Sequence, residues 1–138
     1  MIDILIFIVG LYTITLGTIH FFLPYLLDFD HAIPKEGPAL KPFRLFGFSY
    51  NTTRADARGI AWVMNHSVSY TIVTIGILNL IWPIWRDQAY RPIVCLWIAL
   101  WWVIRAFTQL YLGKRRGDWL VLFWFLSLGI LHFYLAIQ

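Results

Sequence analysis

Side chains that could bind a ligand or move a proton are few in this sequence, and most lie within long apolar runs. Asn65 and His66 are neighbours in the stretch WVMNHSVSY, and Tyr70 follows about one helical turn later. An amide beside an imidazole can recognise a polar group and exchange a proton with it. The candidate ligand-binding or proton-handling residues are His20, Asn65, His66, Tyr70, Arg105 and Gln109. We assign no catalytic residue and no metal ligand.

Arg105 would place a fixed positive charge inside an apolar run. Thr108 and Gln109 follow it by about one turn, and we expect no carboxylate within the apolar runs close enough to neutralise it. The helix rise puts both His66 and Arg105 roughly 11 Å from the same membrane boundary. The guanidinium could hold an anionic or carbonyl group of a quinone, fatty acid or isoprenoid. It could equally extend its side chain to the headgroups.

A structural role for these polar groups is the alternative. Polar residues inside membrane spans are rare and mark functional sites by default. However, interhelical hydrogen bonds of roughly 0.6 kcal/mol each can also fix how helices pack. Both interpretations stay open for His66 and Arg105.

A histidine occurs twice in the same apolar setting. The stretch LGTIHFFL contains Gly17 and His20, and LGILHFYL contains Gly129 and His132. In each case the glycine could let a neighbouring helix approach, and the histidine three residues later could find a partner there. The predicted spans place the two motifs in opposite leaflets, which favours two uses of one packing solution over a shared site. Chance is the alternative, because apolar matches arise easily in a sequence rich in Leu, Ile and Phe.

Several membrane chemistries can be tested against this inventory. A retinal Schiff base needs a lysine in the membrane, and the three lysines lie outside the apolar runs. A di-iron site needs several carboxylates on facing helices, which the runs do not offer. Haem b held by His20 and His66 is a minor candidate, because axial ligation requires the two imidazoles at nearly equal depth. The cofactor is therefore left unknown.

The composition places these residues in a membrane protein. The chain has 138 residues, of which 60% are hydrophobic and only 13% charged, against about 25% charged in soluble domains. Apolar runs at residues 2–27, 59–84, 92–112 and 119–137 are 19 to 26 residues long, and a bilayer requires ~20. Because lipid cannot pair backbone amides, such runs must be helices. We predict an all-α fold, a single transmembrane domain over residues 1–138 built as a four-helix bundle.

The first connection, residues 28–58, is expected to lie at the membrane interface. Pro34, Pro38 and Pro42 argue against one long helix. The stretch KPFRLFGFSY interleaves aromatic and basic residues, as is typical of segments in the headgroup layer. A partner-binding loop is the alternative. After it, Asp56 and Arg58 are expected to open the second helix, and residues 113–117 to form a tight basic turn before the fourth.

The basic residues predict the orientation of the chain. Five lie in the first connection and three in the third, whereas the second holds only Arg86 and Arg91. By the positive-inside rule, the first and third connections face the cytoplasm and both termini lie outside it, in a bacterial inner membrane. The net charge of +4 follows from this bias and does not indicate a nucleic-acid partner.

The end of the first run resembles a known family. GTIHFFLP at residues 17–24, followed by a proline-bearing amphipathic connection, resembles the DoxX-like group of small four-helix bacterial membrane proteins. The resemblance covers about a third of the chain. Where a glycine and an acid would be expected in the second helix of that group, this chain has NHSVSY. The resemblance implies an association with sulfur or quinone redox systems and carries over no functional residue.

Two functions of different classes follow from these observations. The first is an accessory or ligand-binding membrane protein whose polar cluster takes a quinone-like or lipid-like molecule. The alternative is a membrane-embedded enzyme or redox subunit that acts on a lipophilic substrate through His20, His66 and Arg105. The expected partners are the lipid bilayer, a lipophilic small molecule, and another membrane subunit or a second copy of the chain.

Overall fold

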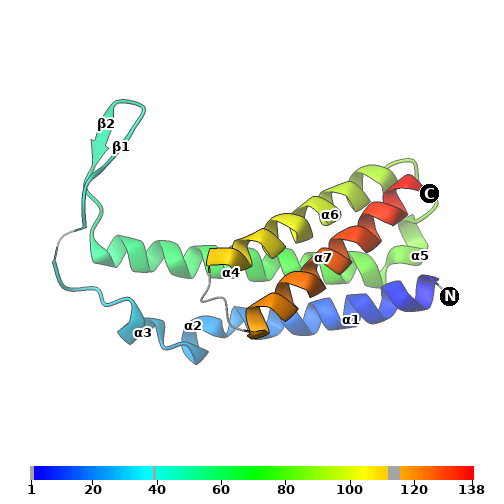
Figure 1. Ribbon diagram of the computed structural model, residues 1–138, viewed down its shortest axis with the longest axis horizontal. Helices are drawn as coiled ribbons and strands as arrows, with labels where there is room; N and C mark the ends of the chain where they lie inside the picture. Colours follow the sequence, from blue (N-terminus) through cyan, green and yellow to red (C-terminus); the bar gives the residue numbers. More distant parts are fainter. Residues whose placement is uncertain (1, 39, 112–115) are drawn as a thin grey trace. The chain divides into compact units, whose positions relative to one another are not determined.

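Long helices dominate the computed structural model, which describes residues 2–38, 40–111 and 116–138, with the backbone alone for 43–45. They are α1 (Ile2–Phe21), α4 (Arg54–Leu80), α6 (Arg91–Thr108) and α7 (Arg116–Ile137), and the 3₁₀ turn η1 (Gln109–Tyr111) extends α6 (Figure 1). Within these described ranges, four helices are long and apolar enough to cross a membrane. The predicted all-α class with four candidate spans is therefore confirmed, and the chain has the composition of an integral membrane protein.

Short elements connect the long helices. Between α1 and α4 lie α2 (Leu23–Leu26), α3 (Phe29–Ala32) and the strands β1 (Phe43–Leu45) and β2 (Phe48–Tyr50). The helical turn α5 (Trp82–Trp85) follows α4. The prolines therefore break this connection as predicted. A β-hairpin occupies the stretch that the sequence assigned to an amphipathic interfacial segment.

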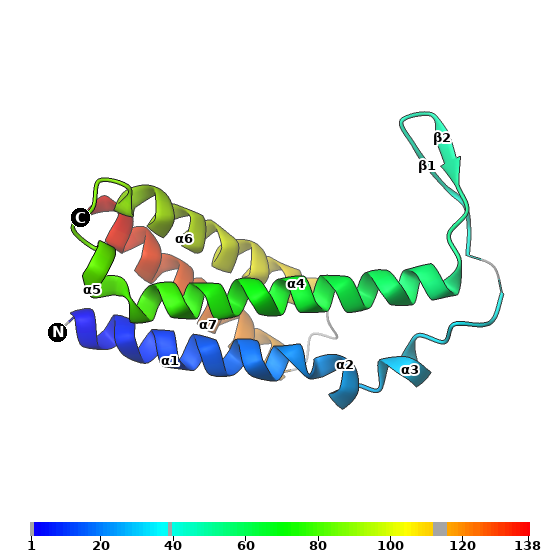
Figure 2. The same cartoon turned by 180° about the vertical axis from the view of Figure 1, so that it is seen from behind.

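The structure falls into two compact units, residues 1–82 and 83–138. The first contains α1 and α4, which lie side by side in the two opposite views of Figures 1 and 2. The second contains α6 and α7. Each unit is built around a pair of antiparallel helices, and the single bundle stays a prediction.

Glycines hold α1 and α4 close together. A Cβ atom at Gly76 would lie 2.6 Å from Ile14 Cγ1 and 2.8 Å from the Ile14 backbone nitrogen, and one at Gly17 would lie 2.7 Å from Val73 Cγ2. Small residues on facing sides allow backbones to approach in this way. At the far end of the pair, the Trp82 indole donates to Asp3 Oδ1 at 3.0 Å. These contacts fix α1 along α4.

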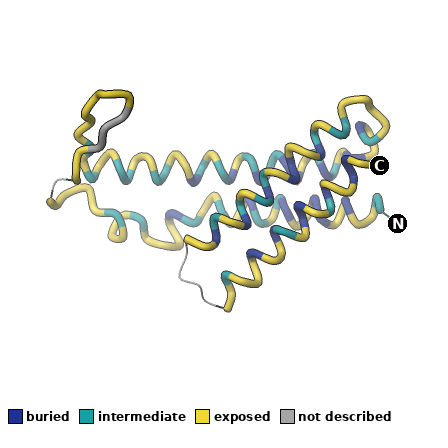
Figure 3. Tube along the Cα trace, turned by 45° about the horizontal axis from the view of Figure 1, so that its top comes forward, coloured by how far each residue is buried: buried dark blue, intermediate teal, exposed yellow. Residues whose placement is uncertain are grey.

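In the second helix pair, a glycine likewise allows the two helices to approach closely. A Cβ at Gly129 on α7 would lie 3.0 Å from Val103 Cγ2 and 3.3 Å from the Ala99 carbonyl oxygen on α6. Beside it, the Trp102 and Phe125 rings pack with centroids 5.1 Å apart. Buried residues recur along the helices of each pair, whereas the described part of the hairpin is exposed (Figure 3).

Local signals set the helix starts. Thr53 and Asp56 form a capping box at the beginning of α4: Thr53 Oγ1 accepts from the Asp56 N–H at 3.1 Å, and the Asp56 carboxylate accepts from the Thr53 N–H at 2.8 Å. The predicted opening of the second helix near Asp56 is confirmed. The predicted basic turn at 113–117 is wrong in its last part, because α7 already begins at Arg116; residues 112–115 lie outside the described ranges.

Hydroxyl groups along α4 bond to carbonyls of their own helix. Ser67 donates to Val63 O at 2.8 Å, and Thr71 and Thr74 donate in the same way to the carbonyls four residues before them. Each of these polar side chains is thus satisfied within one turn.

Candidate functional site

A polar network joins α1 and α4 at His20. The His20 Nδ1 atom lies 3.0 Å from Ser69 Oγ, and Asn65 Nδ2 donates to the His20 carbonyl oxygen at 3.1 Å. Ser69 Oγ also donates to the Asn65 carbonyl at 2.7 Å. The structure therefore brings together two of the predicted site residues, His20 and Asn65, and adds Ser69 between them.

The protons in this network can be assigned by counting donors. Ser69 has one hydroxyl proton, which it donates to the Asn65 carbonyl. Its oxygen must then accept at the His20 contact, so His20 Nδ1 carries the proton. In the neutral ring, the lone pair consequently belongs to Nε2.

His66 is held in a cage of aromatic rings. Its Nδ1 lies 2.9 Å from the Trp62 carbonyl oxygen, which can only accept, so Nδ1 is again the protonated nitrogen. The ring stacks on the Trp62 indole at 5.6 Å between centroids and meets the Phe21 ring edge-on at 4.5 Å. These contacts fix both the position and the tautomer of the His66 imidazole. The lone pair on Nε2 is then the group that can accept a hydrogen bond from a ligand.

More aromatic residues extend this cage around Trp62. The Tyr25 ring packs edge-on against Trp62 at 5.2 Å, and the Phe29 ring at 6.3 Å. We call Phe21, Tyr25, Phe29, Trp62 and His66 the aromatic cluster. It lies where α1, α2 and α3 pass beside α4, and His66 within it is half-buried.

Tyr70 lies outside this arrangement. It follows His66 by one turn on α4, but 75% of its surface is exposed. Its hydroxyl therefore points to the surroundings of the helix pair and not into the network.

Arg105 and Gln109 belong to the second helix pair. The Arg105 guanidinium donates to Thr108 Oγ1 at 2.8 Å and lies over the Phe125 ring, 5.5 Å from its centroid. Among the described residues it forms no ion pair with a carboxylate. Gln109 is buried next to a cavity of about 10 Å³, which is room for at most one water molecule.

The two repeated motifs are only partly alike in three dimensions. Gly17 and Gly129 both contact the neighbouring helix closely, as predicted. His20 reaches across to α4, whereas the buried His132 bonds through Nδ1 to the Leu128 carbonyl of its own helix at 2.8 Å. The packing role of the glycines is therefore shared, whereas the two histidines differ in these hydrogen bonds.

The groove in the second helix pair offers less chemistry. An apolar groove of about 290 Å³ lies between α6 and α7 beside Ala99, Val103 and Gly129, and all of its lining residues are apolar. Such a groove can hold hydrocarbon but cannot orient a polar group. Within the described part of the chain, no three His, Cys, Asp or Glu residues gather as a metal site.

Sequence reasoning missed five members of the site, which do not appear among the predicted site residues: Phe21, Tyr25, Phe29, Trp62 and Ser69. Trp62 precedes His66 by four residues, and Ser69 follows Asn65 by four, so each pair shares a helix face. This spacing could have identified both. Phe21 could not be found in that way, because it comes from another helix.

The sequence and fold were compared with known proteins. No known family matches the chain, and neither do any curated protein or any solved structure. The resemblance to DoxX-like proteins therefore stays a prediction.

Proposed function

We propose that this protein binds a lipophilic molecule in the membrane, with the polar end of that molecule at His66. One observation carries the proposal: the imidazole is oriented by the Trp62 carbonyl and by two aromatic rings, so that its lone-pair nitrogen Nε2 is left as an acceptor. Backbone-anchored imidazoles of this kind are pre-organised for binding.

The surroundings of His66 favour a hydrophobic ligand. The helix rise places His66 about 18 Å from the first residue of α4. Because α4 has 27 residues and is thus about 40 Å long, it exceeds the ~30 Å hydrocarbon core by about 10 Å. If this excess lies at the Arg54 end, His66 is about 8 Å below the boundary, within reach of an amphiphile's head.

The acceptor nitrogen favours a ligand that donates a hydrogen bond. A neutral His66 whose Nδ1 proton is shared with Trp62 can accept but not donate a further bond. Within the quinone-like and lipid-like molecules that the sequence suggests, this selects hydroxyl-bearing forms such as quinols, isoprenoid alcohols or protonated fatty acids. We propose this ligand class for an accessory protein that works alone, with a second copy, or with another membrane subunit.

The proposal includes a membrane arrangement. The four candidate spans would form one bundle in a bacterial inner membrane, with both termini outside the cytoplasm and the α1–α4 connection at the cytoplasmic interface. The excess of Lys and Arg in the first and third connections supports this orientation.

A matched pair of ligands tests the proposal. The protein in lipid nanodiscs is titrated with 4-nonylphenol and with 4-nonylanisole, its methyl ether, which cannot donate a hydrogen bond. We expect the phenol to bind more tightly by roughly 3- to 10-fold, the factor for one neutral hydrogen bond. His66→Phe keeps an aromatic ring in the cluster and should remove this difference.

The control is the same substitution outside the cluster. His31 lies exposed on α3 and bonds to Asp28, so His31→Phe should leave the preference for phenol unchanged. Equal binding of phenol and ether to the unmodified protein would overturn the proposal. A Soret band after expression with a supply of haem would favour the alternative, a redox subunit with His20 and His66 as ligands.

A further inference from the structure

The β-hairpin between α3 and α4 has two chemically different faces. Its strands pair antiparallel, with Phe43 opposite Tyr50, Arg44 opposite Ser49 and Leu45 opposite Phe48. Residues that lie opposite each other share a face, and faces alternate along a strand. Positions 43, 45, 48 and 50, all apolar or aromatic, therefore share one face of the ribbon, and positions 44 and 49 share the other.

The tip of the hairpin is also aromatic. Phe46 and Gly47 form a two-residue turn in which both have positive φ, 50° and 85°, as the tight turns of twisted hairpins require. Glycine adopts this conformation readily, but a bulky residue does so only at a conformational cost. Phe46 is nevertheless 90% exposed at this turn. Such a strained, exposed aromatic residue suggests a surface that the tip contacts.

Two side chains of the apolar face have much of their surface exposed. Phe48 is 66% exposed and Tyr50 45% exposed. A two-stranded hairpin alone is at best marginally stable in water. Burial of this face against another phase would therefore stabilise the hairpin as well as the contact.

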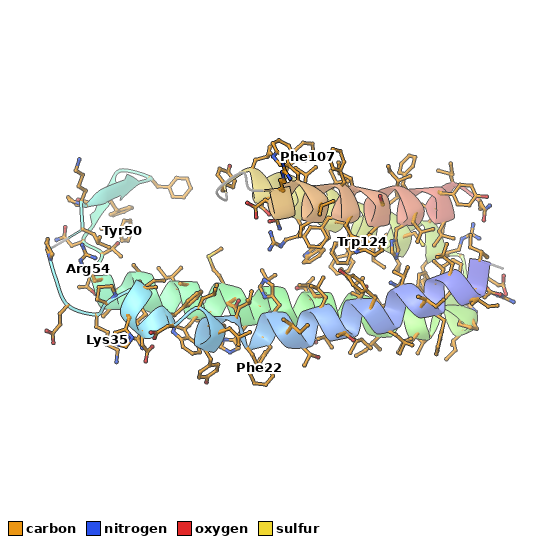
Figure 4. All side chains as sticks on the ribbon, turned by 60° about the horizontal axis from the view of Figure 1, so that its bottom comes forward. Phe22, Lys35, Tyr50, Arg54, Phe107 and Trp124 are labelled. Atoms are coloured by element: carbon orange, nitrogen blue, oxygen red, sulfur yellow. The ribbon has the colours of Figure 1, made fainter. Side chains whose placement is uncertain are left out.

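The position of the hairpin in the chain indicates which phase that is. The hairpin ends at Tyr50, three residues before the Thr53 cap of α4, and projects sideways from that helix (Figures 1 and 2). Tyr50 and Arg54 lie at its base (Figure 4). Because it projects sideways, the hairpin runs along the membrane surface and not down the axis of α4. If the about 10 Å by which α4 exceeds the hydrocarbon core lies at the Arg54 end, the hairpin lies at the level of the headgroups, where one of its faces can contact the lipid boundary.

Two contacts hold the base of the hairpin to α4. Arg54 Nε donates to the Pro38 carbonyl at 3.0 Å, and Arg58 forms an ion pair with Asp30 on α3. The stretch preceding the hairpin is thereby fixed to the first two turns of α4. Lys41, two residues before the first strand, adds positive charge, which attracts anionic phospholipid headgroups.

We propose that the hairpin inserts its apolar face and the Phe46 tip into the headgroup–acyl boundary of the bilayer that its own helices span. The contacted surface is anionic phospholipid, with the face of Arg44 and Ser49 turned to water. This inference rests on the proposed membrane placement of the chain, and it is independent of the ligand site at His66.

Spin labels on the second strand test the inference. In a Cys95→Ala background, single cysteines at positions 48, 49 and 50 carry a nitroxide, and the protein is placed in nanodiscs that contain phosphatidylglycerol. Accessibility is measured to oxygen, which concentrates in lipid, and to a water-soluble nickel chelate. We expect labels at 48 and 50 to be at least threefold more accessible to oxygen than to the chelate, and a label at 49 to show the reverse.

The alternation between faces is the decisive result. Equal accessibility of all three labels to the chelate would overturn the inference. Equally low accessibility of all three labels to the chelate would overturn it too, because it would indicate that protein covers the hairpin. The double substitution Phe46→Ser with Phe48→Ser should expose a label at position 50 to the chelate. If nanodiscs of purely zwitterionic lipid gave the same protection as anionic ones, the assigned lipid class would be wrong. Loss of phenol binding at His66 would change none of these outcomes.

Discussion

Ser69 has more influence on the α1–α4 contact than its size suggests. It accepts from the His20 imidazole on one side and donates to the Asn65 carbonyl on the other, and it is almost fully buried. By taking the acceptor role toward His20, it decides which imidazole nitrogen keeps the lone pair. A hydroxyl at this position therefore sets the tautomer of a histidine on a different helix.

Removal of the Ser69 hydroxyl should weaken the helix pair slightly. In Ser69→Ala, His20 Nδ1 loses its acceptor across the interface, and we expect the free energy of unfolding in detergent to fall by about 0.6 kcal/mol, up to about 1.7 kcal/mol. Ser67→Ala is the control, because Ser67 is exposed and bonds only to its own helix. Equal stability of the two variants would contradict an interhelical role for Ser69.

For individual residues, the sequence showed which polar side chains stand out in an apolar run, but it did not show which residues they contact. Asn65 and His66 stood out as polar groups in an apolar run, and the structure places Asn65 in a network with His20. The exposure of Tyr70 was not foreseen, because one polar residue per turn says little about which side of a helix is covered. The Phe21 contact with His66 depends on how α1 is aligned along α4, which no local pattern encodes.

At the level of the helices, the pairing of α1 with α4 depends on glycine positions at which any larger side chain would clash with the neighbouring helix. At Gly76 the nearest atoms include the Ile14 backbone nitrogen, which cannot move unless α1 itself moves. The close approach in turn allows His20 to reach Ser69 across the interface. Packing and the polar network are therefore coupled.

Gly76→Ala should separate the two helices. The added methyl group would lie 2.6 to 2.8 Å from Ile14 atoms, so we expect a loss of about 1–3 kcal/mol in unfolding free energy. Gly59→Ala in the same helix meets open space and should instead gain about 0.4–1 kcal/mol. Denaturant titration of both variants in one detergent measures the difference; a stable Gly76→Ala protein would show that the pair tolerates a wider spacing.

The long helices were predictable and the hairpin was not. Length and apolar composition alone determine that a run must be a helix in lipid, and the Thr53–Asp56 pair marks the start of α4. In the first connection, the aromatic and basic residues indicated an interface without indicating an element. The alternation of FRL and FSY around Phe46–Gly47 is a hairpin pattern, but Phe-Gly is not one of the common turn pairs.

On the scale of the whole molecule, the chain consists of two helix pairs that each have their own close contacts. The sequence could predict the number of candidate spans from hydropathy, whereas the orientation inferred from charge stays a prediction. It could not predict the pairing of helices, because apolar faces look alike in composition and small residues occur in every span.

The proposed orientation can be measured with two single cysteines in a Cys95→Ala background. Gln88 lies exposed in the second connection and Asn51 exposed in the first. In bacterial spheroplasts, a membrane-impermeant maleimide should label Gln88→Cys readily and Asn51→Cys only after permeabilisation, at least tenfold less before it. Labelling of Asn51→Cys in intact spheroplasts would invert the topology.

The hydroxyl-to-carbonyl bonds along α4 affect how this helix enters the bilayer. Of the four candidate spans, α4 has the lowest mean hydropathy. A hydropathy scale that sums the residues one by one therefore predicts that α4 enters lipid less readily than the other three. Yet Ser67, Thr71 and Thr74 already satisfy their donors within the helix. Transfer of such a segment from water to lipid therefore costs less than its composition implies.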